Sequence, residues 1–113
     1  MSSYKNWTEH TAHVKATFAA LGKDHPKMLQ AFIALDQASA AEALDEKTRE
    51  LISLAVAITT RCESCISVHA EAAAKAGATE SEIAGALATA IAMNAGAAYT
   101  YALRAMEAVK AQS

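Results

Sequence analysis

Few residues in this 113-residue sequence interrupt a helix, because it contains only one proline and four glycines. Aromatic residues are also scarce, at 5%, whereas hydrophobic residues reach 53% and charged residues 19%. That balance excludes an intrinsically disordered chain. Alanine, the strongest helix former, supplies much of the apolar content, and no stretch alternates as a strand would. The sequence therefore predicts an all-α bundle with a single domain over residues 1–113.

The sequence also has little net charge and no cluster of charges of one sign. Its formal net charge is −2 at pH 7, and Lys and Arg are scattered along the chain. This distribution does not attract nucleic acid or anionic lipid. Residues 1–7 lack the apolar core of a signal peptide, and the apolar run Leu51–Ile58 is too short to cross a bilayer. We therefore expect a cytoplasmic protein with no nucleic-acid partner and no membrane partner.

Start and stop signals predict about six helices. The expected spans are roughly residues 3–21, 24–39, 45–60, 62–76, 79–94 and 97–111. The expected N-caps include Asp24, Asp45 and Thr79. Thr79 and Glu82 have the spacing of a capping box. Asn94 with Gly96 is interpreted as a kink or a close helix crossing.

The predicted third helix is apolar on nearly all sides over Leu51–Ile58, which predicts deep burial. Alanine buries little area per residue, and a domain of this size is already limited by its ratio of surface to volume. A monomer would therefore have a weak core. We expect some helices to bury apolar faces against other subunits.

Cys62 and Cys65 form a C-x-x-C motif and are the only cysteines in the chain. Three positions apart on a helix, their Cβ atoms lie roughly 5–6 Å apart, so a modest adjustment allows a disulfide. The start of a helix, next to Arg61, favours a thiolate. His69 follows Cys65 by one turn on the same face and could take the thiol proton or return it to a leaving oxygen.

Glu50 is expected to meet His69 across a helical hairpin. Glu50 lies about ten residues, roughly 15 Å, before the predicted turn at residues 59–61. His69 lies about eight residues, roughly 12 Å, after it. A carboxylate within an apolar helix needs a partner, and His69 is the nearest candidate. The implied proton relay runs from Glu50 through His69 to Cys65.

Other interpretations of these four residues remain open. Cys62, Cys65, His69 and Glu50 could supply four zinc ligands, although zinc cysteines usually come from a turn and not from consecutive helical turns. A structural disulfide is disfavoured because no secretory signal is present. Glu50 could instead have a capping role or form an ion pair with Lys47 or Arg49. We favour the redox pair and expect neither a metal nor a cofactor.

The spacing E-x11-C-x-x-C-x3-H, formed by Glu50, Cys62, Cys65 and His69, resembles that of the AhpD-like alkylhydroperoxidases of the carboxymuconolactone decarboxylase family, over roughly residues 44–108. The resemblance implies an all-helical bundle and peroxidase activity. Cys65 would attack the hydroperoxide, activated through His69 and Glu50, and Cys62 would resolve the sulfenic acid. It also implies a dithiol electron donor of the lipoyl or thioredoxin type and, together with the alanine-rich helices, a homo-trimer or homo-hexamer.

Ser64 departs from this pattern, because well-studied alkylhydroperoxidases carry a second histidine just before the inner cysteine. The function predicted from the sequence is a thiol-dependent peroxidase. One alternative is a decarboxylase-like lyase in which Glu50 and His69 donate protons to a muconolactone-like acid, but that chemistry has no need for the cysteine pair. A second alternative is a non-catalytic redox sensor.

Overall fold

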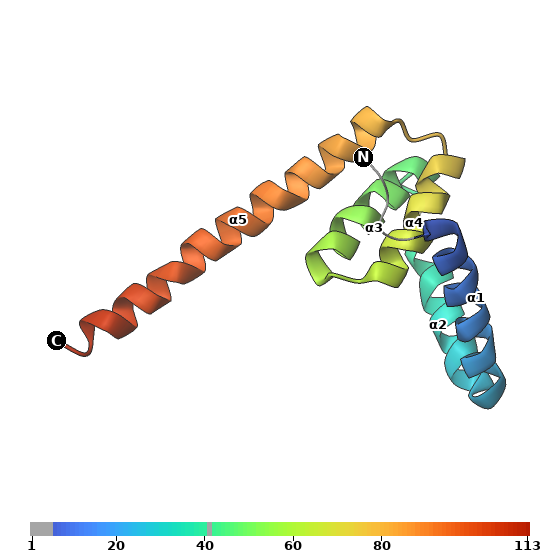
Figure 1. Cartoon of the computed structure of the whole chain (residues 1–113), viewed down its shortest axis with the longest axis horizontal. Coiled ribbons are helices and arrows are strands. Elements are labelled where there is room, and N and C mark those ends of the chain that lie inside the picture. Colours follow the sequence, from blue (N-terminus) through green and yellow to red (C-terminus); the bar gives the residue numbers. More distant parts are fainter. Residues whose placement is uncertain (1–5, 41) are drawn as a thin grey trace.

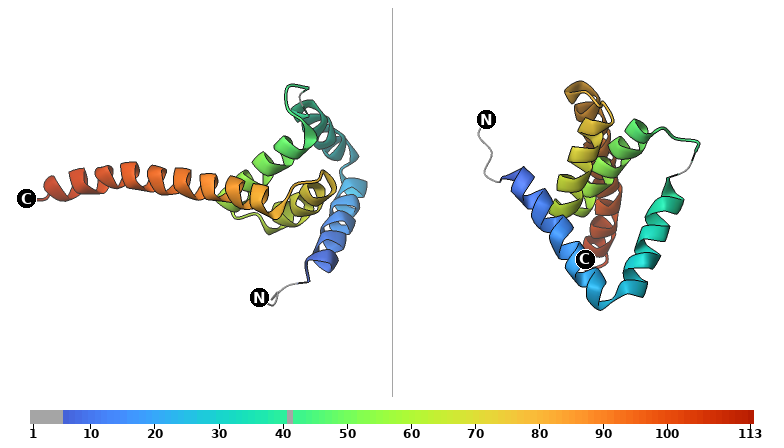
Figure 2. Two further views of the ribbon diagram at one scale, coloured as in Figure 1. Left: turned by 90° about the horizontal axis from the view of Figure 1, so that it is seen from above. Right: turned by 90° about the vertical axis from the view of Figure 1, so that its right-hand side faces the viewer.

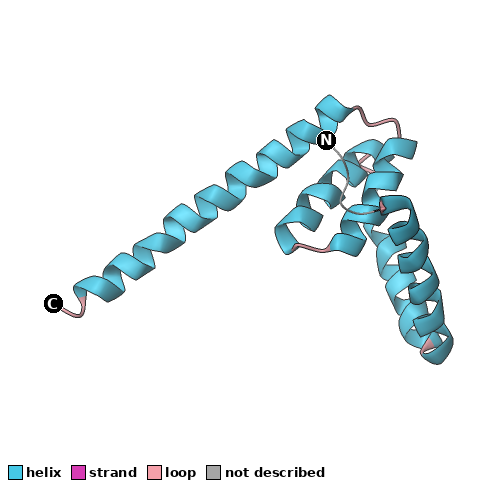
Figure 3. Cartoon of the chain, in the orientation of Figure 1, coloured by secondary structure: helices cyan, strands magenta, loops and turns pink. Residues whose placement is uncertain are grey.

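The computed structural model describes residues 6–40 and 42–113, and Figure 1 shows the chain as a set of helices. Their bounds are α1 (Trp7–Asp24), α2 (Pro26–Ser39), α3 (Glu46–Thr60), α4 (Glu63–Lys75) and α5 (Glu80–Lys110). No strand occurs among the described residues, as the colouring of Figure 3 makes plain. The prediction of an all-α fold is confirmed.

The last two predicted helices form one continuous helix, α5, of 31 residues. The expected break at Asn94 is wrong, because the side-chain amide of Asn94 donates to the Ala90 carbonyl at 2.7 Å and to the Thr59 hydroxyl of α3 at 2.9 Å. The polar side chain is therefore satisfied without interrupting the helix. Gly96 costs only about 1 kcal/mol relative to alanine, and strong helix formers surround it. The described chain thus has five helices in place of six.

The predicted N-caps are confirmed at two positions and wrong at one. The Asp45 side chain accepts the Thr48 backbone N–H at 2.7 Å, and this hydrogen bond lowers the pKa of Asp45. Thr79 and Glu82 form the predicted capping box. Asp24, however, is the last residue of α1, and His25 stands at the N-cap position of α2 without a side-chain capping bond.

The first helix does not end at Gly22 as predicted, because this glycine marks a close approach between helices. Gly22 is buried within α1, and a Cβ atom there would overlap the Leu29 side chain of α2. Its missing side chain therefore lets α1 and α2 approach each other just before Pro26. At its other end α1 begins at Trp7, capped by Asn6; the expected start at residue 3 lies outside the described residues.

The small core lies between α3, α4 and the first half of α5, and α1 packs on the outside of α4. α3 and α4 form an antiparallel hairpin, and the first half of α5 packs along α3. The buried apolar residues are few and mostly small: Leu54, Ala57, Ala73 and Ala90. Lys47 of α3 contacts Glu82 of α5 at 2.8 Å, and this hydrogen bond lowers the pKa of Glu82. The sequence-based alternative that pairs Lys47 with Glu50 is therefore wrong.

The prediction that the third helix is deeply buried is also wrong for a single chain. Only Glu50, Leu54 and Ala57 of α3 are buried, a set that follows the i, i+4, i+7 spacing of a single helix face. Ile52 and Val56, on the other side, are 49% and 55% exposed. The reason is that neighbouring helices of the same chain cover one face of α3 and leave the other uncovered.

Two parts of the chain extend away from this core. Every residue of α5 beyond Ala90 is exposed, and that half projects alone in Figures 1 and 2. α1 and α2 form a V-shaped arm. Among the described helices, α2 packs only against α1. The radius of gyration is accordingly 18.3 Å, whereas a compact chain of this length has about 13 Å.

α5 is long and apolar enough to cross a bilayer, judged by its length and composition alone. The sequence drew attention only to the shorter run Leu51–Ile58, because dividing α5 at Asn94 concealed its full length. One such helix is weak evidence for a membrane span, because helices that pack against protein pass the same test.

Candidate functional site

The turn between α3 and α4 places the cysteines at one end of the hairpin. Arg61 adopts the left-handed conformation, with φ of 54°, and ends α3. The backbone N–H of Arg61 donates to the Ile58 carbonyl at 3.3 Å, and that of Cys62 donates to the Ala57 carbonyl at 3.0 Å. This is the hydrogen-bond pair of a Schellman motif. It leaves Cys62 extended at the N-cap of α4, close to the predicted helix start.

Cys62 and Cys65 are joined by a disulfide, with their Cα atoms 5.2 Å apart. Cys65 occupies the third position of α4, so the disulfide closes over the first helical turn. The Cys62 sulfur also accepts the backbone N–H of Cys65 at 3.3 Å, and the Ser64 hydroxyl lies 3.4 Å from it. The predicted C-x-x-C spacing is thus compatible with a disulfide that leaves α4 intact.

Glu50 and His69 meet across the hairpin, as the sequence predicted. His69 Nδ1 donates to Glu50 Oε1 at 2.6 Å, since an ionised carboxylate can only accept. Glu50 is 5% exposed, and the His69 side chain is 30% exposed. Arg49, the second ion-pair partner considered from the sequence, lies 3.9 Å from Glu50 Oε2. This contact is longer than the one between His69 and Glu50.

The buried carboxylate fixes the orientation of the imidazole. With Nδ1–H directed at Glu50, the proton-free nitrogen is Nε2, which can accept a proton from a donor on the other side of the ring. His69 lies one turn beyond Cys65 on α4, and successive turns share a face. The four predicted residues are therefore gathered on the α3–α4 hairpin. Their catalytic roles stay predictions.

These side chains do not form a ligand set for a metal. Over residues 6–40 and 42–113, no group of three or more His, Cys, Asp or Glu side chains is arranged to hold an ion. A zinc site of the kind considered from the sequence needs Cys62, Cys65, His69 and Glu50 to converge on one point. In this structure the cysteines bond to each other, and Glu50 bonds to His69.

Two contacts near the site were not anticipated from the sequence. The contact between the Ser64 hydroxyl and Cys62 could have been predicted, because Ser64 lies two residues after the N-cap of α4. The buried contact between the hydroxyls of Thr11 and Ser67, which fastens α1 to α4, had no such signal, because 56 residues separate the pair. Ser67 also lies 3.4 Å from the Trp7 carbonyl.

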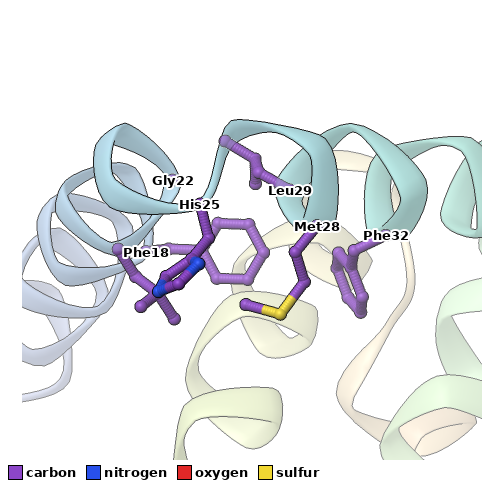
Figure 4. Close-up of a pocket in the computed structure, with 7 residues that line it drawn as sticks. Phe18, Gly22, His25, Met28, Leu29 and Phe32 are labelled. Atoms are coloured by element: carbon purple, nitrogen blue, oxygen red, sulfur yellow. The ribbon is translucent and has the colours of Figure 1, made fainter.

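Two hollows of the surface lie away from the disulfide. One, of about 190 Å³, lies in the fork of the α1–α2 arm, and Figure 4 shows its apolar lining. It is formed by Phe18, Leu21, Gly22, His25, Met28, Leu29 and Phe32. A second, between α1 and α4, is lined by residues that include Trp7, Thr11 and Ser67. Neither includes a cysteine, so neither places a substrate against the C-x-x-C motif.

Comparison with known proteins places the chain in a family. Residues 26–108 match the model of the carboxymuconolactone decarboxylase family. The chain is 67% identical over 110 residues to an uncharacterised protein of Haemophilus influenzae, covering 96% of this chain and 97% of that protein. It is 44% identical over 77 residues to uncharacterised protein 4 in the cox locus of Paracoccus denitrificans, covering 67% and 69%. An uncharacterised protein of Cupriavidus necator is 31% identical over 94 residues, covering 82% and 83%.

The family match spans most of the chain and includes the whole α3–α4 hairpin with Glu50, both cysteines and His69. It confirms the family that the spacing of these four residues indicated. The chain belongs to the carboxymuconolactone decarboxylase family.

Proposed function

We propose that the protein is a cytoplasmic thiol-dependent peroxidase that reduces hydroperoxides. The observation that carries the proposal is the 2.6 Å bond between buried Glu50 and His69, one helical turn from a cysteine pair that forms a disulfide. A structural disulfide needs no adjacent acid–base pair, and a lyase needs no disulfide. Their combination favours chemistry in which a thiol is both deprotonated and oxidised.

The cycle begins with the dithiol. His69 Nε2 takes the Cys65 thiol proton, the thiolate attacks the nearer peroxide oxygen, and the O–O bond breaks. The proton on His69 passes to the departing alkoxide, so the products are an alcohol and a sulfenic acid on Cys65. Cys62 then attacks that sulfur and releases water, which closes the disulfide. A dithiol donor of the lipoyl or thioredoxin type restores both thiols and leaves as its own disulfide.

Counting thiols tests this proposal against its alternatives. One equivalent of a hydroperoxide added to the reduced protein should remove two thiols per chain and form the Cys62–Cys65 disulfide. Multiple turnovers should follow with dihydrolipoamide as the donor. Unchanged thiols would favour the lyase, in which Glu50 and His69 move protons on a carboxylic acid. Thiol loss without turnover would favour the redox sensor.

We also propose that the working protein is a homo-oligomer, a trimer or a hexamer. The chain exposes 8744 Å², whereas a compact monomer of its mass exposes about 5,900 Å². The excess, about 2,800 Å², is enough for the interfaces of an obligate oligomer. Among the exposed side chains, Tyr99, Leu103 and Met106 form an apolar stripe at helical spacing on the free half of α5.

The partner for this stripe is a second copy of the chain, whose α1–α2 arm offers the apolar hollow shown in Figure 4. The free half of α5, residues 91–110, is about 30 Å long, and α2 is about 21 Å long, so one can lie along the other. Among the described residues, neither surface packs against a further helix of its own chain. Asn94 is bonded to Thr59, next to the cysteine turn, so a copy held on α5 would also lie near the disulfide.

Light scattering at micromolar concentration tests the assembly. We expect a mass of three or six times 11.8 kDa, and a fall to the single-chain mass when Leu103 and Met106 are both replaced by Glu. Ala108→Glu, on the opposite face of α5, is the matched control and should leave the mass unchanged. A wild-type mass near that of one chain would contradict the proposal. Binding of α5 to phospholipid vesicles, lost in the Leu103→Glu and Met106→Glu variant, would assign the stripe to a membrane.

A further inference from the structure

The two sulfurs of the C-x-x-C motif lie in different surroundings. Cys62 is the N-cap of α4, and its Sγ accepts the Cys65 backbone N–H at 3.3 Å. The Ser64 Oγ lies 3.4 Å from the same sulfur, so its hydroxyl proton can also be directed there. The Cys65 sulfur makes no equivalent pair of contacts with the described residues.

These contacts matter most when the disulfide is reduced. A thiolate at a helix N-cap accepts unpaired N–H groups and lies at the positive end of the helix dipole. A hydrogen bond to an ionised acceptor is stronger than one to a neutral acceptor. The Ser64 hydroxyl would therefore stabilise a Cys62 thiolate more than a Cys62 thiol. Arg61, adjacent in sequence, acts in the same direction, and Glu63 opposes it.

We propose that Ser64 is a positioning residue that, together with the Cys65 amide, stabilises the Cys62 thiolate and prepares it to resolve the sulfenic acid on Cys65. The second half of this inference rests on the proposed peroxidase function, whereas the first concerns the reduced protein alone. Ser64 stands where well-studied alkylhydroperoxidases carry a histidine. In this protein a neutral hydroxyl occupies that position, 3.4 Å from the Cys62 sulfur.

The resolving step balances with these groups. The Cys62 proton is already with solvent, and the Cys62 thiolate attacks the Cys65 sulfur of the sulfenic acid. The S–S bond forms as the S–O bond breaks, and the departing hydroxide takes a proton to become water. Cys62 is oxidised and the sulfenic sulfur is reduced, so no external oxidant is needed. Ser64 keeps its own proton throughout.

The test measures the Cys62 thiol by itself, in a Cys65→Ser background, from the absorbance of the thiolate against pH and from the rate of alkylation by iodoacetamide. Ser64→Ala should raise the pKa of Cys62, with about a tenfold smaller acid dissociation constant, the usual worth of one hydrogen bond to an ionised group. Alkylation below that pKa should slow only about threefold, because a more basic thiolate is also more nucleophilic.

Two further variants make the test specific. Ser64→Thr retains a hydroxyl and should restore the wild-type titration. Ser81→Ala removes a serine from the same position of α5, two residues after its N-cap, and should change nothing. An unchanged Cys62 titration in Ser64→Ala, or an equal change in Ser64→Thr, would overturn the inference.

The consequence for the cycle is tested in the protein with both cysteines. In Ser64→Ala, the sulfenic acid on Cys65 should persist about threefold longer before the disulfide closes, as followed by trapping with dimedone. The Cys62 titration could shift as expected in a protein that never consumes hydroperoxide. That result would refute the proposed function, but it would support the role of Ser64 in stabilising the thiolate. An unchanged lifetime in an active enzyme would instead overturn its part in the resolving step.

Discussion

Replacing Cys65 by serine should abolish hydroperoxide consumption, whereas replacing Cys62 by serine should allow a single attack per chain. Cys65 lies one helical turn from His69, whose Nδ1 is held by Glu50, which leaves Nε2 as the ring nitrogen that can take a proton. Without Cys65 no thiol remains one turn from His69, the residue that would protonate the departing alkoxide. Without Cys62 the sulfenic acid has no resolving partner and should accumulate on Cys65.

Mass spectrometry of the two peroxide-treated variants measures this difference directly. The Cys62→Ser protein should gain one oxygen on the peptide that contains Cys65, and the Cys65→Ser protein should remain unmodified over the same time. Sulfenic acid on Cys62 in the Cys65→Ser variant, formed at an undiminished rate, would reverse the two roles. The comparison is informative because the N-cap position of Cys62 also favours a thiolate.

Removing either member of the Glu50–His69 pair should slow the attack by about 10²- to 10⁴-fold, the usual worth of a positioned acid–base group. His69→Ala removes the base. Glu50→Ala leaves the imidazole without the carboxylate that selects its tautomer. Because the two residues act as a unit, the double variant should be hardly slower than either single variant. Stopped-flow measurement of sulfenic acid formation gives these rates.

The control for this series is Glu46→Ala, an exposed carboxylate in the first turn of the same helix, which should leave the rate unchanged. Stability must be followed in parallel, because His69→Ala leaves the buried Glu50 carboxylate short of a hydrogen-bond donor, at a cost of about 1–3 kcal/mol or more. A folded Glu50→Ala protein with the wild-type rate of attack would show that the carboxylate holds the hairpin together and takes no part in the chemistry.

Much of the site was predictable because it depends on short distances along the chain. The caps at Asp45 and Thr79 are local hydrogen bonds spanning three residues. The C-x-x-C geometry needs only the helical repeat. Even the contact between Glu50 and His69 follows from counting residues on both sides of one tight turn, since an α-helix rises about 1.5 Å per residue. These features require no knowledge of the rest of the fold.

The tertiary structure decided what depends on partners far away in sequence. α5 runs unbroken past Asn94, whose side-chain amide donates to Thr59 on α3, 35 residues earlier. Gly22 lies within α1, where Leu29 of the next helix packs against it. Lys47 pairs with Glu82 and not with Glu50. Helical periodicity could not predict the exposure of Ile52 and Val56 either. An apolar pattern states that a face prefers burial, but only the arrangement of the other helices determines whether the same chain can bury it.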